Sequence, residues 1–391
     1  MQTPVLRRGV MALLASACLL LSACSSADGP AAGDGASPPA APTSAPATAS
    51  PSAELPPAEG SVEVVKTLAD GLASPWGVAA LPGGDLLVGS RDEATVTRVD
   101  GESGKKTLLG SVPGVAPAGE GGLLGLAVAP TFGADHLVYA YFTTESDNRI
   151  ARLQYDEKKP AGRQLGAPDT ILRGIPKGAI HNGGRIAFGP DRMLYAGTGE
   201  TGDTGLAQDA SSLGGKILRM TPDGEPVHGN PGGDSTVYSS GHRNVQGLAW
   251  DSSKRLWASE FGQDTWDELN LIEPGGNYGW PEVEGKRGKS GFVDPVAEWK
   301  TSQASPSGIA YAEGSIWMAG LRGERLWRIP LSGRADGQPL ADPQAFLTGK
   351  YGRLRTVVAA GGDRLWLVTS NTDGRGTPKA GDDRILLLKV R

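Results

Sequence analysis

The chain has 391 residues, of which 58 are Gly and 29 are Pro, so these two turn-forming residues make up more than a fifth of it. This excess argues against a helical bundle, because each interior Gly costs a helix about 1 kcal/mol, and it favours many short strands joined by tight turns. A hydrophobic content of 39% excludes global disorder, and the two cysteines, Cys18 and Cys24, exclude a disulfide scaffold and a zinc-thiolate site. The net charge of −5 and the lack of any basic run exclude nucleic acid as an expected partner.

The N-terminus has the features of an export signal. Arg7 and Arg8 precede a short apolar stretch at residues 10–23, whereas a membrane-spanning helix needs about 20 apolar residues. The stretch ends in Leu21-Ser22-Ala23-Cys24, which resembles a bacterial lipobox. The resemblance implies cleavage after residue 23 and a lipid on Cys24, so we expect a protein anchored to the outer face of the bacterial cell membrane. An ordinary secretory signal is the alternative, and the twin arginines leave the export route open.

Residues 24–60 form the next segment. After Cys24 they consist almost entirely of Ala, Pro, Ser, Thr and Gly. Such a composition buries too little apolar surface to offset the entropy of ordering the chain. We therefore predict a flexible, proline-stiffened tether between the lipid and a folded domain at residues 61–391.

The folded part contains six copies of one pattern. A small or polar residue, an aliphatic residue and a small residue are followed by a turn and then by an alternating apolar run, as in Gly77-Val78-Ala79 before Pro82-Gly83-Gly84-Asp85. The copies begin at residues 77, 125, 185, 247, 308 and 356. Repeats of strand, turn and strand at this spacing are typical of propeller blades. We predict an all-β, six-bladed β-propeller, with a β-sandwich as the alternative, and expect the functional site at the mouth of the central channel.

A histidine and a glutamate border the third repeat. His181 precedes its first strand among glycines that allow a ligand to approach, and Glu200 follows the next strand. A histidine in this position is a candidate general base, and a neighbouring carboxylate can orient the imidazole and stabilise its charged form. A surface or capping histidine is the alternative interpretation.

Four arginines lie near blade boundaries: Arg243, Arg322, Arg353 and Arg355. A guanidinium presents a planar fork of donors that suits carboxylates. Together the four would form a cationic ring around a ligand with several negative charges. Scattered surface charges are the alternative.

An acidic loop at residues 259–270 contains Asp264, Asp267 and Glu268 beside several loop carbonyls. Hard oxygen ligands of this kind suit calcium. A solvated acidic turn would have the same composition.

Four longer segments carry a family resemblance. They are Gly119-Glu120-Gly121-Gly122-Leu123-Leu124-Gly125, His181-Asn182-Gly183-Gly184-Arg185, Gly241-His242-Arg243-Asn244-Val245-Gln246-Gly247, and Asp267-Glu268-Leu269-Asn270-Leu271-Ile272 running to Gly276-Asn277-Tyr278-Gly279-Trp280-Pro281. Over residues 61–391 the chain resembles the soluble pyrroloquinoline quinone (PQQ)-dependent sugar dehydrogenases, the glucose/sorbosone dehydrogenase family. The resemblance implies a six-bladed propeller, which agrees with the repeat count.

The resemblance also implies roles for individual residues. His181 would be the catalytic base and Glu200 its partner acid, where better-known members have Asp. The quinone carboxylates would be held by Arg243, Arg322, Arg353 and Arg355, with Asn244 as a further cofactor contact. Glu120 stands where a Gln contacts the substrate region.

Two calcium ions are implied as well. The cofactor calcium would be held by the carbonyls of Gly262 and Gln263, and a structural calcium by Glu268 and the carbonyl of Tyr278. Phe261 and Gln263 depart from the Gln and Pro that relatives have in the cofactor-calcium loop. The long loops that shape glucose specificity and dimers in relatives are short or missing, so we expect a monomer.

The sequence therefore predicts a lipid-anchored dehydrogenase for a sugar or related alcohol. His181 would take the hydroxyl proton, hydride would pass to the quinone, calcium would polarise the quinone oxygen, and electrons would leave to an external acceptor. Two alternatives remain: a calcium-dependent lactonase, which would need acid and amide side chains around a channel metal, and a non-enzymatic propeller that binds glycans or proteins.

Overall fold

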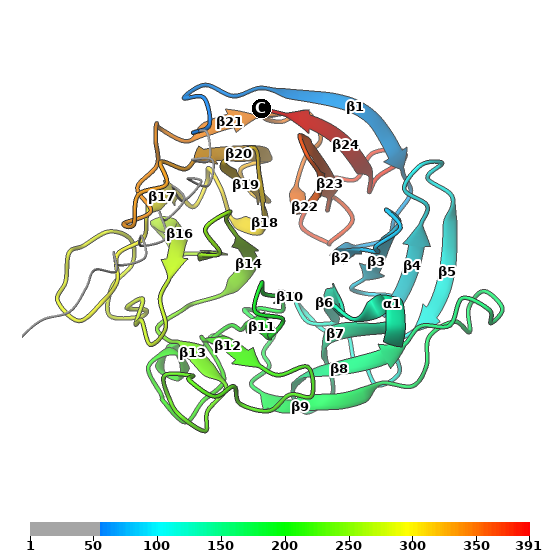
Figure 1. Cartoon of the computed structure of the whole chain (residues 1–391), viewed down its shortest axis with the longest axis horizontal. Helices are drawn as coiled ribbons and strands as arrows, with labels where there is room; N and C mark the ends of the chain where they lie inside the picture. Colours follow the sequence, from blue (N-terminus) through cyan, green and yellow to red (C-terminus); the bar gives the residue numbers. More distant parts are fainter. Residues whose placement is uncertain (1–54) are drawn as a thin grey trace, which may run out of the picture. The chain divides into compact units, whose positions relative to one another are not determined.

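Six four-stranded antiparallel sheets surround a central channel in the computed structural model, which describes residues 55–391 (Figure 1). The signal segment, Cys24 and the tether up to residue 54 lie outside the described residues. Within residues 55–391, no helix combines the length and the hydrophobicity that a membrane-spanning helix requires. The predicted all-β, six-bladed propeller is confirmed.

Each blade runs from an inner strand at the channel to an outer strand at the rim. The inner strands are β2 (Pro75–Ala80), β6 (Leu123–Val128), β10 (Ile186–Phe188), β14 (Val245–Trp250), β18 (Pro306–Ala312) and β22 (Leu354–Gly361). The second strands are β3 (Leu86–Ser90), β7 (Leu137–Thr143), β11 (Leu194–Gly197), β15 (Leu256–Glu260), β19 (Ser315–Gly320) and β23 (Arg364–Thr369). The third strands are β4 (Thr95–Val99), β8 (Asn148–Gln154), β12 (Ile217–Met220), β16 (Trp266–Ile272), β20 (Arg325–Pro330) and β24 (Ile385–Val390). The outer strands are β5 (Lys106–Ser111), β9 (Asp169–Ile175), β13 (Val237–Ser239), β17 (Ala297–Lys300), β21 (Gln344–Phe346) and β1 (Val62–Ala69). Two short helices, α1 (Phe132–Asp135) and η1 (Thr204–Ala207), lie in loops.

The repeated pattern in the sequence marks the inner strands. Every predicted start lies within one of these strands or, at residue 185, immediately before β10. Steric crowding explains why glycine opens most copies of the pattern. A Cβ atom on Gly77 would lie 2.2 Å from the carbonyl oxygen of Leu124, and one on Gly125 would lie 2.1 Å from that of Gly184. Because neighbouring inner strands approach so closely at the channel, only glycine fits there.

The last blade joins the two ends of the folded region. Strand β1 pairs with β24, with Val62 opposite Val390, and so supplies the outer strand of the blade formed by β22, β23 and β24 (Figure 1). This pairing closes the ring, because a strand from the start of the folded region completes the last blade. Contacts begin slightly before the predicted start at residue 61, because Arg328 Nη2 donates to the carbonyl of Pro57 at 2.7 Å.

The hydrophobic core lies between blades. Six clusters of buried side chains join adjacent blades. In one of them, Leu87 on β3 packs with Leu126 on β6 and Ala140 on β7. Each fully buried Leu contributes roughly 1.5–3 kcal/mol, so the packing between blades fixes the strand ends that carry the loops of the channel mouth.

Candidate active site

His181 and Glu200 form a hydrogen-bonded pair next to the third inner strand, with Glu200 buried and His181 partly exposed. His181 lies in the segment between β9 and β10, and Glu200 lies just after β11. His181 Nδ1 is hydrogen-bonded to Glu200 Oε1, and the two side chains are only 12% and 1% exposed. Glu200 Oε2 accepts a hydrogen bond from the backbone N–H of Gly202 at 3.0 Å. The carboxylate is thus fixed on both oxygens and holds the imidazole so that Nε2 remains available on the cavity side.

Glu120 lies against the same histidine. Its Oε2 accepts a hydrogen bond from the backbone N–H of His181 at 2.9 Å, and its Oε1 lies 2.7 Å from Arg375 Nη2. Glu120 therefore touches the residue expected to be the base and also lines the cavity in front of it.

A cavity of about 240 Å³ collects most of the predicted site residues. It is lined by six arginines and two acids, with His181, Trp76, Gln246 and a few loop residues. The charged lining residues are Arg91, Arg243, Arg322, Arg353, Arg355, Arg375, Glu120 and Asp373. All four arginines that the sequence indicated therefore reach one cavity, and its lining carries an excess of positive charge.

Asp373 organises two of these arginines. Its Oδ2 lies 2.9 Å from Arg353 Nη2 and 3.1 Å from Arg355 Nη2. Burial alone would raise the pKa of Asp373, but the two guanidinium groups hold that pKa below its usual value. Burial lowers the pKa of Arg355 to about 10, which leaves it charged at neutral pH. The sequence did not indicate Asp373, because it lies in a loop after β23 that carries no repeated pattern.

The guanidinium group of Arg243 has a hydrogen-bond donor that no acceptor engages. Burial lowers its pKa, and its Nε atom is buried with no hydrogen-bond partner in the part of the chain that the structure describes. Its guanidinium lies 5.4 Å from the ring centre of Trp280. A buried N–H without an acceptor is costly, so this donor is suited to an anionic ligand in the cavity.

Asn244 occupies a different place from the arginines. It is fully buried and does not line the cavity. Its Oδ1 accepts a hydrogen bond from Gly183 N at 2.9 Å, while its Nδ2 lacks a partner among residues 55–391. The bond to Gly183 supports the turn that carries His181, and a cofactor contact by Asn244 remains a prediction.

The residues predicted to hold calcium fall into two places. Gly262 and Gln263 line the main cavity. Glu268 and Tyr278 border a neighbouring space of about 10 Å³, together with Glu260, and Gly262 borders this space as well. Within residues 55–391 no group of three or more His, Cys, Asp or Glu side chains is arranged to hold a metal. Any calcium at either place would depend largely on backbone carbonyls.

Glu268 is the strongest single metal-ligand candidate. It lies opposite Glu260 on neighbouring strands, and its Oε1 accepts a hydrogen bond from Gly285 N at 2.7 Å. Burial and the nearby charge of Glu260 raise the pKa of Glu268. The amide nitrogen of Asn270 donates to both carboxylates, at 2.9 Å to Glu260 Oε1 and at 3.1 Å to Glu268 Oε2.

Comparison with known proteins identifies the family. A family model described as glucose/sorbosone dehydrogenase matches residues 72–386, which is most of the folded region. The chain belongs to the glucose/sorbosone dehydrogenase family. Family membership confirms the prediction made from the motifs and the predicted enzyme class.

Three relatives illustrate the similarity. The PQQ-bound form of aldose sugar dehydrogenase from Streptomyces coelicolor is 75% identical, covers 86% of this chain and all of that one, and superposes with a TM-score of 0.85. Aldose sugar dehydrogenase YliI from Escherichia coli is 29% identical over 81% of this chain and 92% of its own. Quinoprotein glucose dehydrogenase B from Acinetobacter calcoaceticus is 32% identical over 64% of this chain and 59% of its own length.

Proposed function

We propose that this member of the family is a PQQ-dependent dehydrogenase that oxidises an aldose to a lactone. The observation that carries the proposal is one cavity that combines six arginines with the His181–Glu200 pair. The Streptomyces relative at 75% identity, whose structure holds PQQ, supports the choice of cofactor. A related alcohol is the alternative substrate.

The cavity lining fits a flat anion with several carboxylates, such as PQQ. Arg243, Arg353 and Arg355 would bind these carboxylates, and Arg322 would contribute from its exposed loop. The unpartnered Nε of Arg243 supplies a donor that the protein itself does not use. Charge-assisted hydrogen bonds to carboxylates are about twice as strong as neutral ones, so a ring of arginines provides both affinity and orientation.

The residues of the chain then divide the chemistry as follows. His181 Nε2 accepts the proton of the substrate hydroxyl, because Nδ1 is engaged by Glu200. Glu200 stabilises the imidazolium that results, and Glu120 holds the backbone N–H of His181 while offering an acceptor near the substrate. When bound, PQQ supplies the electron sink, taking two electrons and the hydrogen of the oxidised carbon. The products are a lactone and the reduced cofactor, which an external acceptor reoxidises.

Calcium is part of the proposal. Gly262 and Gln263 line the cofactor cavity, and no hydrogen bond to either carbonyl oxygen is formed among residues 55–391. Free carbonyl oxygens are suitable ligands for calcium, which would act there as a Lewis acid. A structural calcium would bind at Glu268 and the carbonyl of Tyr278.

We further propose that the enzyme works outside the cytoplasm as a monomer held by a lipid on Cys24. The support is the lipobox-like segment and the composition of the tether. Metabolic labelling with a radioactive fatty acid tests the anchor: the wild-type chain should incorporate label, and the Cys24→Ser variant should not.

A reconstitution assay tests the activity. The purified full chain is incubated with PQQ and Ca²⁺, and reduction of a dye acceptor is followed with a panel of aldoses. We expect aldose-dependent reduction that requires added PQQ and that falls when Ca²⁺ is chelated. Hydrolysis of lactones without any response to PQQ would instead support the lactonase alternative.

A further inference from the structure

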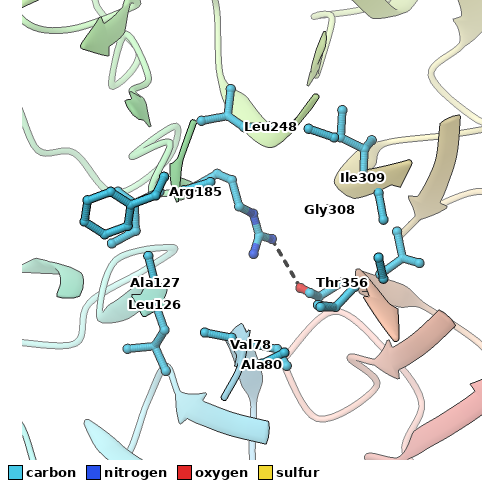
Figure 2. Close-up of a pocket in the computed structure, with 18 of the residues that line it drawn as sticks. Val78, Ala80, Leu126, Ala127, Arg185, Leu248, Gly308, Ile309 and Thr356 are labelled. Carbon is cyan, nitrogen blue, oxygen red and sulfur yellow. Dashed lines mark hydrogen bonds between the residues drawn. The ribbon is translucent and has the colours of Figure 1, made fainter. Parts of the chain in front are cut away.

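The side chain of Arg185 extends from the start of β10 across the central channel (Figure 2). It borders a space in the channel to which inner strands of all six blades contribute, and it does not line the catalytic cavity. It is only 7% exposed. Because Arg185 lies outside the catalytic cavity, it can influence that cavity only through the residues that it contacts.

Arg185 contacts inner strands of three other blades. Its Nε donates to the carbonyl of Gln246 on β14 at 2.7 Å. Its Nη2 donates to Thr356 Oγ1 on β22 at 3.2 Å (Figure 2). Its guanidinium lies 4.4 Å from the ring centre of Trp76 on β2. Thr356 Oγ1 donates in turn to the carbonyl of Trp76 at 2.8 Å, so the contacts form one connected network.

The three partners of Arg185 are also neighbours of Arg355. Gln246 Oε1 accepts a hydrogen bond from Arg355 Nη1 at 3.0 Å. The guanidinium of Arg355 lies 5.7 Å from the ring centre of Trp76, and Thr356 is the next residue in the chain. Arg355, Gln246 and Trp76 all line the catalytic cavity. Arg185 therefore holds the surroundings of an arginine that reaches this cavity.

Arg185 has no acidic partner. Burial and the nearby Arg355 lower the pKa of Arg185 to about 9, and no acidic group among residues 55–391 opposes this shift. At neutral pH it is still a cation, and a buried charge without a counter-charge destabilises a fold. An apolar side chain could fill the same place at a lower cost. It would lack the divergent donors and the flat face that a guanidinium presents.

We propose that Arg185 is a positioning residue for Arg355 in the binding of PQQ. It fixes the amide and the indole ring beside Arg355, so that this guanidinium meets the cofactor carboxylate in one orientation. The orientation matters because a hydrogen bond depends on direction as well as on distance, and a donor that is ordered beforehand loses less entropy on binding. This inference rests on the proposed cofactor.

Calorimetric titration of the purified full chain with PQQ tests the proposal. Arg185→Met should raise the dissociation constant at least tenfold, which corresponds to the loss of about one charge-assisted hydrogen bond. Arg185→Lys keeps the charge but lacks the divergent donors and the flat face, so its affinity should lie within threefold of that of Arg185→Met. Wild-type affinity in either variant would overturn the proposal; for Arg185→Lys it would show that the charge alone matters.

Arg328→Met is the matched control. Arg328 is also buried, donates to the carbonyl of Pro57 and to Gln344 Oε1, and lies 6.0 Å from the ring centre of Trp317. It lies on β20 and does not line the catalytic cavity. Its replacement should leave the affinity for PQQ unchanged within twofold. Equal losses in the Arg328 and Arg185 variants would point to general destabilisation and refute the assigned role.

A double-mutant cycle tests whether Arg185 acts through Arg355. In an Arg355→Met background, Arg185→Met should raise the dissociation constant less than threefold, because the guanidinium that it positions is absent. The same loss in both backgrounds would contradict the proposal. If Arg185→Met does not fold, Thr356→Val replaces it, since valine keeps the shape and removes the acceptor of Arg185 Nη2. This variant should bind PQQ at least threefold more weakly than wild type, and unchanged binding would refute the role of Arg185.

The two levels of the account fail in different ways. Failure of the wild-type chain to bind PQQ would refute the proposed cofactor and this inference with it. Tight binding of PQQ by wild type and equally tight binding by Arg185→Met would refute only the role of Arg185.

Discussion

Replacing Glu200 by Gln should slow aldose oxidation while leaving PQQ binding intact. The Glu200 side chain is 1% exposed, touches His181 Nδ1 through one oxygen and accepts from Gly202 N through the other. Glutamine keeps this shape but removes the charge that stabilises the imidazolium.

The size of the effect follows from the contact that is lost. A hydrogen bond to a charged group contributes about 1.5–3 kcal/mol, and each 1.36 kcal/mol of barrier is a factor of ten in rate. The turnover number should therefore fall by roughly 10- to 150-fold. If the glutamine amide donates to Nδ1, Nε2 becomes protonated and the loss approaches the roughly 10⁴-fold limit of general-base catalysis.

The assay is steady-state dye reduction by the PQQ-loaded enzyme, with PQQ affinity measured separately. Glu200→Asp is the matched control, because it keeps the charge and shortens the side chain by one methylene. It should retain more activity than Glu200→Gln. Turnover of Glu200→Gln within threefold of wild type, at saturating PQQ, would refute the role given to this carboxylate.

Three further predictions concern the arginine ring and buried charges. Arg243→Met should raise the dissociation constant for PQQ by roughly 10- to 150-fold, from the loss of one charge-assisted contact, whereas Arg173→Met on the outer strand β9 should leave PQQ titrations unchanged. Asp373→Asn removes the counter-charge of two arginines at a side chain that is only 3% exposed, so the apo-protein should lose about 3–5 kcal/mol of unfolding free energy. PQQ should then add more stability to this variant than to wild type. Equal melting temperatures of the two proteins without PQQ would contradict this. Burial lowers the pKa of Lys216 to about 8, so the folded state binds fewer protons than the unfolded chain between about pH 8 and 10.5. Below pH 8 Lys216 is charged in the folded state, and the full free-energy cost of burying that charge destabilises the fold. This cost falls as the pH rises, so denaturant unfolding should show wild type gaining stability across this window relative to Lys216→Met.

The sequence was most informative where one steric constraint recurs. The glycine that opens most repeats is required wherever neighbouring inner strands meet, as at Gly77 and Gly125, so the pattern marked all six inner strands. Strand β1 has no such constraint. Its partner β24 lies more than 300 residues away in the chain, and only ring closure brings the two together.

The site could be predicted only where residues form continuous motifs. His181, Glu200 and the four arginines carry recognisable sequence contexts, and all but Glu200 line one cavity, with Glu200 bonded to His181 behind it. Arg91, Arg375 and Asp373 come from loops that the propeller brings together across the channel mouth, and nothing local in the sequence distinguishes them from surface charges.

The most direct test of the central claim is a single turnover without an external acceptor. Wild type and His181→Gln are each loaded with PQQ and Ca²⁺ and mixed anaerobically with an aldose, while the absorbance of the bound cofactor is recorded. Wild type should reduce one equivalent of cofactor and form one equivalent of lactone, and His181→Gln should bind PQQ equally but react at least a hundredfold more slowly. Failure of PQQ-loaded wild type to reduce its cofactor with any aldose, or equal rates for the two proteins, would contradict the account.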